Sequence, residues 1–128
     1  MELRPRDLAK IGQLVLNRGD WRERRIVSAS WIKAMTTPQI PLPADPRYRR
    51  WGLFGYGYLW WLGRSSVGGR DIDWAGGLGL GGQRLYVVPS LDLIVAVTAG
   101  DFVFGSPHGQ GRAGRTARDM ALRAASVH

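Results

Sequence analysis

Cysteine is absent from the 128-residue chain, and histidine occurs only twice, as His108 and His128. Without cysteine the chain forms no disulfides and no thiolate metal sites. Neither histidine has a second ligand at metal-binding spacing, so the sequence predicts no metal site and no cofactor. No apolar run approaches the roughly 20 residues that span a bilayer, and no signal-like apolar segment follows the N-terminus. We therefore expect no membrane span and take the cytoplasm as the default compartment.

Lysine is also scarce, because Lys10 and Lys33 are the only lysines among 18 basic residues. The net charge is nevertheless +8, and a basic protein that binds nucleic acid gathers such charge on one face. Here the densest arginine clusters, at 22–25 and 47–50, lie near turn residues and share no helical face. We therefore expect no nucleic-acid partner. The 45% of hydrophobic residues, with six tryptophans, indicates a folded domain.

The first half of the chain has two helical patterns. Apolar residues recur at helical spacing from Pro5 onward and stop before Gly19, which predicts a helix over residues 5–17. A second helix is expected at 28–35, with Ser28 as N-cap and with Trp31, Ile32 and Met35 facing inward. Residues 36–50 contain four prolines and predict an irregular loop.

Strand patterns follow. Residues 51–63 predict a central strand, with Tyr56, Tyr58, Trp60 and Leu62 on one face. Strands are also expected at 84–88 and 93–98, joined by a turn at 89–92, whereas Asp71–Ala75 is not predicted as a buried strand. A glycine-rich linker at 105–114 precedes a weak helix at 115–125, which has Ala117, Met120 and Leu122 to bury. Helices, antiparallel strands and a final helix indicate an α+β fold.

Three glycines spell G-x-G-x-x-G, namely Gly77, Gly79 and Gly82, and Asp101 follows where a ribose-binding acid would stand. A dinucleotide site needs a strand before the glycines and a helix after them. The residues after Gly82 are β-branched and aromatic, and Pro89 would break a helix there. The motif therefore does not predict a nucleotide site.

The same glycines belong to a series of blocks that resembles the C-terminal part of the serine β-lactamase-like hydrolases. The family includes class C β-lactamases, D-alanyl-D-alanine peptidases, esterases and 6-aminohexanoate oligomer hydrolases. The resemblance covers about residues 3–100, and its blocks in order are 3–21, 26–38, 55–61, 79–83 and 86–95. It implies that residues 1–104 form the C-terminal part of one hydrolase domain, a partial β-lactamase/transpeptidase-like fold, followed by the linker and helix of 105–128.

The family's chemistry uses three elements. An S-x-x-K helix supplies the nucleophilic serine and its lysine, a tyrosine loop supplies a second acid or base, and an edge strand supplies a backbone N–H to the oxyanion hole. The resemblance places that strand at Gly77–Leu80, with the Leu80 N–H facing the oxyanion. Gly77, Leu78, Gly79 and Gly81 would then lie against the substrate, and Gly81 with Gly82 would admit a sharp bend. The alternative is a glycine-rich bulge with no role in binding.

Two departures from the family qualify its function. Gly77 and Leu78 replace a basic and a hydroxyl residue, which argues against carboxylate recognition and favours an esterase-like or amidase-like parent. The one S-x-x-K, at Ser30 and Lys33, falls after the family's catalytic machinery, and no Y-x-N or Y-x-S is present. The resemblance therefore implies a hydrolase fragment that works on a small ester, amide or peptide-like substrate only with an N-terminal half. A binding module with an aromatic ligand face at Tyr56 to Trp61 is the alternative.

Overall fold

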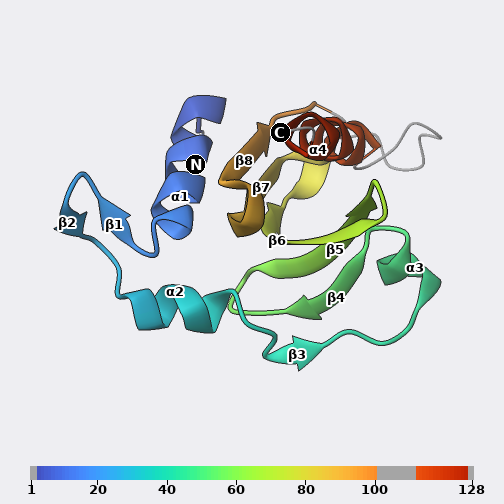
Figure 1. Ribbon diagram of the computed structural model, residues 1–128, viewed down its shortest axis with the longest axis horizontal. Coiled ribbons are helices and arrows are strands. Elements are labelled where there is room, and N and C mark those ends of the chain that lie inside the picture. The colour runs from blue at the N-terminus through green and yellow to red at the C-terminus, as the bar shows by residue number, and fades with distance from the viewer. Residues whose placement is uncertain (1–2, 101–111, 127–128) are drawn as a thin grey trace.

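A six-stranded antiparallel sheet with helices on both faces forms the protein (Figure 1). The computed structural model describes residues 3–100 and 112–126. The sheet has the strand order β3-β4-β5-β6-β7-β8, so from β4 onward each strand pairs with the one before it in the chain. This arrangement is the α+β fold that the order of sequence patterns predicts. Its strands are β3 Ile40–Pro41, β4 Leu53–Tyr56, β5 Trp61–Val67, β6 Arg70–Leu78, β7 Arg84–Val88 and β8 Leu93–Val97.

The helices α1 (Pro5–Leu16) and α2 (Ala29–Met35) lie close to their predicted ranges. The first ends before Gly19, whose φ of 95° is a glycine conformation. The second begins after Ser28, whose hydroxyl accepts a hydrogen bond of 3.2 Å from the Trp31 N–H. Between the helices lies a two-stranded ribbon of β1 (Asp20–Trp21) and β2 (Arg24–Arg25). A short helix α3 (Pro46–Arg49) interrupts the predicted loop.

The predicted strand at 51–63 is wrong in one respect, because the chain reverses between β4 and β5. The Gly57 N–H donates to the Trp60 carbonyl at 2.8 Å, and Leu59 has a φ of 62°. A Cβ at position 57 would overlap the Met35 carbonyl, so only glycine lets the chain turn this close to α2. Tyr56, Tyr58, Trp60 and Leu62 therefore do not share the face of one strand.

The sequence prediction that Asp71–Ala75 is not a buried strand is also wrong. These residues lie in β6, where Ile72 and Trp74 are buried while Asp71 and Asp73 are exposed. Because side chains alternate along a strand, one face of β6 enters the core and the other carries carboxylates. A turn at Gly68 and Gly69, both with positive φ, connects β5 to β6.

The core has two parts, one on each face of the sheet. On the face covered by α4 (Arg112–Ala125), called here the α4 face, the buried residues are Ile72, Trp74, Tyr86, Val88 and Leu122. The opposite face, called the α1 face, packs Val87 against Val15, Ile32 and Met35 of the first two helices. Neighbouring residues of β7 therefore serve opposite cores, which explains why all five are buried.

Several sequence predictions near the helices and the C-terminus need correction. Trp31 is 49% exposed, whereas Ile32 and Met35 are buried as predicted. In α4, Leu122 is buried as predicted, but Met120 is 66% exposed and Arg118 is only 5% exposed. The helix begins at Arg112, three residues earlier than predicted. The rest of the predicted linker, together with Asp101 and both histidines, lies outside the described residues.

Candidate functional site

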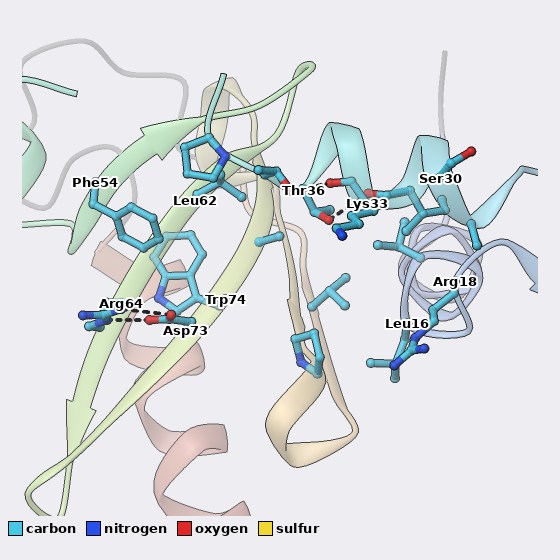
Figure 2. Close-up of a pocket in the computed structure, with 18 residues that line it drawn as sticks. Leu16, Arg18, Ser30, Lys33, Thr36, Phe54, Leu62, Arg64, Asp73 and Trp74 are labelled. Carbon is cyan, nitrogen blue, oxygen red and sulfur yellow. Dashed lines mark hydrogen bonds and ion pairs between the residues drawn. The ribbon is translucent and has the colours of Figure 1, made fainter. Parts of the chain in front are cut away.

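A groove of about 770 Å³ lies on the α1 face of the sheet (Figure 2). Its floor crosses three adjacent strands through Leu62, Ala75 and Val87, which are direct partners in the sheet register. Val15 of α1 and Ile32 of α2 line its helical side. The floor and this side are therefore apolar, and α1 with α2 covers only part of this face.

An ion pair stands at one end of the groove. Arg64 of β5 and Asp73 of β6 are register partners and form a bidentate ion pair. The Arg64 Nε lies 2.5 Å from Asp73 Oδ1, and its Nη2 lies 3.0 Å from Oδ2. The hydrogen bond to Asp73 raises the pKa of the Arg64 guanidinium above its usual value. Arg18 and Lys33 also line the groove, so its lining residues carry three basic side chains against one carboxylate.

The glycine-rich segment lies at the end of β6, beyond the groove. The ladder between β5 and β6 ends at Trp61 and Gly76, whereas Gly77 and Leu78 continue to pair with β7. Although β6 is an inner strand, its last two residues thus have one edge without a β5 partner. A Cβ at Gly77 would meet no atom within 4 Å, so this glycine is not required for packing.

A tight loop follows β6. It contains a 3-10 turn, η1 (Leu80–Gly82), in which Gly81 and Gly82 have φ values of 74° and 88°. Loop closure comes from the Gly79 N–H, which donates to the Gln83 carbonyl at 2.8 Å. Arg84 reinforces the closure because its Nη1 donates to the carbonyls of both Gly79 and Gln83. The sharp bend predicted from the glycines is therefore present.

Leu80 itself is 59% exposed at the start of this turn. The hydrogen bonds among the described residues include none donated by its backbone N–H. This donor is thus available to a ligand, as an oxyanion hole requires. The groove lining does not extend to it, since along β6 that lining ends at Ala75. The structure keeps Leu80 and its neighbours together but apart from the groove.

The Ser30 and Lys33 pair does line the groove, yet its geometry does not activate a nucleophile. The Ser30 hydroxyl donates to the Ser28 hydroxyl at 3.1 Å. Figure 2 shows it pointing away from the Lys33 amine. None of the four tyrosines of the chain lines the groove either. Within the described residues, the groove therefore lacks an activated serine with a tyrosine beside it.

The aromatic residues around the β4–β5 turn divide into separate pairs. Tyr56 and Trp61 pack edge to face at 4.7 Å, and Trp60 packs against the core of the α1 face. Tyr58 instead stacks on Trp31, with ring centroids 5.1 Å apart, and each residue is 49% exposed. The segment from Tyr56 to Trp61 thus contributes one exposed stacked pair, Tyr58 with Trp31, and not a continuous aromatic face.

Sequence reasoning missed a group of arginines on the α4 face. Arg84 and Arg118 are each 5% exposed, and Arg118 lies over the rings of Trp74 and Tyr86. Burial raises the pKa of the Tyr86 hydroxyl above its usual value and lowers that of the Arg84 guanidinium. The only signal in the sequence is that Arg115 and Arg118 stand three residues apart on a helix.

In the part of the chain that the structure describes, no three His, Asp or Glu side chains lie where they could hold a metal ion. No helix within residues 3–100 and 112–126 is both long and apolar enough to cross a bilayer. No protein-family model matches the sequence, and a search of the curated proteins finds no relative.

Proposed function

We propose that this chain supplies the oxyanion side of a serine hydrolase related to the β-lactamase-like family. The substrate would be a small ester, amide or peptide-like molecule, cleaved through an acyl-serine intermediate. One observation carries the proposal: β6 ends in a glycine segment that is unpaired on one edge and is followed by Leu80, whose N–H donates to none of the described residues. The α+β architecture agrees with the fold that the resemblance implies.

The proposed mechanism assigns a limited task to each residue. Attack of a serine on a carbonyl places negative charge on its oxygen, and a fixed N–H at hydrogen-bond distance stabilises that charge. Leu80 would donate this N–H through its backbone, while the second donor would be the N–H of the attacking serine. Gly77 has no side chain and has open space beside it, so a substrate could lie along this edge of β6.

The nucleophile itself is proposed to come from outside this sequence. Ser30 is bonded to Ser28 and points away from Lys33, which argues against a local S-x-x-K pair. The apolar groove on the α1 face supports the same conclusion, because a groove of this size is an unusual feature to leave facing water. We propose that the part of the hydrolase bearing the serine, its lysine and the tyrosine packs against this face.

Two experiments test the proposal. The DNA upstream of Met1 should contain, in frame, an S-x-x-K followed by Y-x-N or Y-x-S, and a coding sequence without them would refute it. The isolated chain should not react with a fluorophosphonate probe, since it has no activated serine. Labelling that is lost in Ser30→Ala but kept in the matched Ser28→Ala variant would instead make Ser30 the nucleophile.

A second candidate function rests on the stacked pair of Trp31 and Tyr58. Two parallel rings, each half exposed, resemble the platforms on which sugar rings stack. If the chain is a binding module, added glycans should change the tryptophan fluorescence. The change should disappear in Trp31→Ala and persist in Trp21→Ala, a substitution away from the stacked pair. If no glycan of a panel changes the fluorescence, the binding-module candidate is refuted and the hydrolase proposal is the one that remains.

A further inference from the structure

Three arginines gather on the α4 face where α4 meets the start of β7. Arg84 and Arg115 both lie over the Trp51 ring, with Cζ atoms 5.4 and 4.6 Å from its centroid. Arg118 lies 5.6 Å from the Tyr86 ring centroid and donates to the Trp51 carbonyl at 3.2 Å. The three guanidinium groups therefore occupy one region, on the opposite side of the sheet from the groove.

Among the described residues, this region carries more positive than negative charge. In the segments that the structure describes, these three arginines form one ion pair, between Arg118 and Asp119 at 2.8 Å. Within residues 3–100 and 112–126, the one hydrogen bond of the Arg115 side chain is long, at 3.4 Å to the Arg50 carbonyl. Burial lowers the pKa of Arg84, and the positive charge of Arg115 lowers it further. Buried like charges are costly unless an anion compensates them.

Two hydrogen-bond donors in the same region have no partner. In the described part of the chain, the buried side-chain polar atoms without a hydrogen bond are the Arg84 Nε and the Tyr86 hydroxyl oxygen. Arg84 is 5% exposed and Tyr86 is fully buried. The Tyr86 hydroxyl neighbours Arg84, but the two form no hydrogen bond of acceptable geometry. A buried N–H and O–H left unpaired are expected to find an acceptor.

We propose that Arg84, Arg115 and Tyr86 bind a small oxyanion, of which inorganic phosphate is the simplest example. The free groups are donors, and the surrounding charge is positive, so the ligand must offer several acceptor oxygens and negative charge. Arg115 is only partly buried, so solvent reaches the cluster at this residue, whereas Arg84 and Tyr86 lie beneath it. Its position near the N-terminal end of α4 adds the favourable end of the helix dipole. The contacts that indicate this site do not depend on the proposed hydrolase function.

The test is a titration of the whole chain with sodium phosphate, balanced with sodium chloride to constant ionic strength. Phosphate should raise the thermal transition saturably, by roughly 10 °C at about a hundred times Kd, and should release heat in a calorimeter. Arg115→Gln should weaken binding at least about tenfold, as expected for loss of a charged donor. Arg123→Gln, which removes an exposed arginine of the same helix, should leave the affinity unchanged.

A second variant keeps the proposal testable if Arg115→Gln does not fold. Tyr86→Phe removes only the hydroxyl, so without phosphate it should melt at the same temperature as the wild type, and its phosphate affinity should fall. An equal rise in melting temperature with sodium chloride would overturn the proposal, because ionic screening would then suffice. An unchanged phosphate response in Arg115→Gln or in Tyr86→Phe would overturn it as well.

Discussion

Replacing Gly63 with alanine tests the packing between β5 and β6 most directly. Gly63 and Trp74 are register partners, and the indole ring lies across the glycine. A Cβ at position 63 would stand 2.5 Å from Trp74 Cε2 and closer still to two other ring carbons. Contacts this short cannot persist, so either the ring or the strand must move.

The cost of that movement follows from what holds Trp74. Trp74 is 3% exposed, and its Nε1 donates to the Ser65 hydroxyl at 3.1 Å. Its ring packs edge to face on Tyr86, with the ring centroids 5.0 Å apart. Overpacking such a core costs about 1–3 kcal/mol. For a chain of this length, we expect Gly63→Ala to lower Tm by about 4–12 °C.

The measurement is thermal unfolding followed by far-UV circular dichroism. The matched control is Gly77→Ala on the neighbouring strand β6, where a Cβ would meet no atom within 4 Å. That variant should remain within about 0.5 kcal/mol of the wild type. A Gly63→Ala protein as stable as Gly77→Ala would refute the placement of the Trp74 ring and the register that produces it.

Three further predictions follow from the groove, the buried phenol and the glycine loop. The isolated chain should self-associate in size-exclusion chromatography because its apolar groove faces water, and Phe54→Ser, which changes a 41% exposed groove residue, should shift it toward monomer. Burial raises the pKa of the Tyr86 hydroxyl above its usual value of 10.0, so folding favours the neutral hydroxyl. The stability gained from this preference is complete below about pH 10 and is lost as the pH rises through the folded pKa. Melting temperatures measured from pH 8 to 11 should thus fall less steeply in Tyr86→Phe than in the wild type, and parallel curves would contradict this. In a complete, complemented hydrolase, Leu80→Pro should lower turnover about a hundredfold or more by deleting the N–H, whereas Leu80→Ala should cost little. A Leu80→Pro protein that is folded by circular dichroism and turns over normally would show that another N–H serves the oxyanion.

The elements that the sequence predicted well are those with local signals. Ser28 caps α2 through its own hydroxyl, and Gly19 ends the first helical segment through its positive φ. The β-branched and aromatic run at 84–88 forms β7 over the same residues. In each case the determining interaction lies within a few residues along the chain, so a short window of sequence contains the cause.

The missed elements depend on contacts between distant segments. At the reversal, Gly57 lies against the Met35 carbonyl, an approach that leaves no room for a Cβ and that no local pattern records. The aspartates of β6 looked incompatible with a buried strand, yet they only occupy its exposed face. Arg118 is buried because the rings of Trp74 and Tyr86, from two different strands, form its floor. The bend at Gly81 was predictable from glycine alone, but the arginines around it were not.

Arg84 connects the arginine cluster with the glycine loop, and this connection leads to the last prediction. Its Nη1 donates to the carbonyls on either side of the Leu80–Gly82 turn, while its Nε is free for the proposed oxyanion. An oxyanion bound at Nε would fix the guanidinium and thereby hold both carbonyls. Hydrogen exchange of the backbone amides at 80–82 should therefore slow when phosphate is added, whereas the amides at 29–35 in α2 should be unaffected. Because the loop is held through Arg84, the protection should vanish in Arg84→Lys, which retains the charge but lacks the Nε–H. Equal slowing across the whole chain would indicate general stabilisation and would contradict a specific link between the cluster and the Leu80 loop.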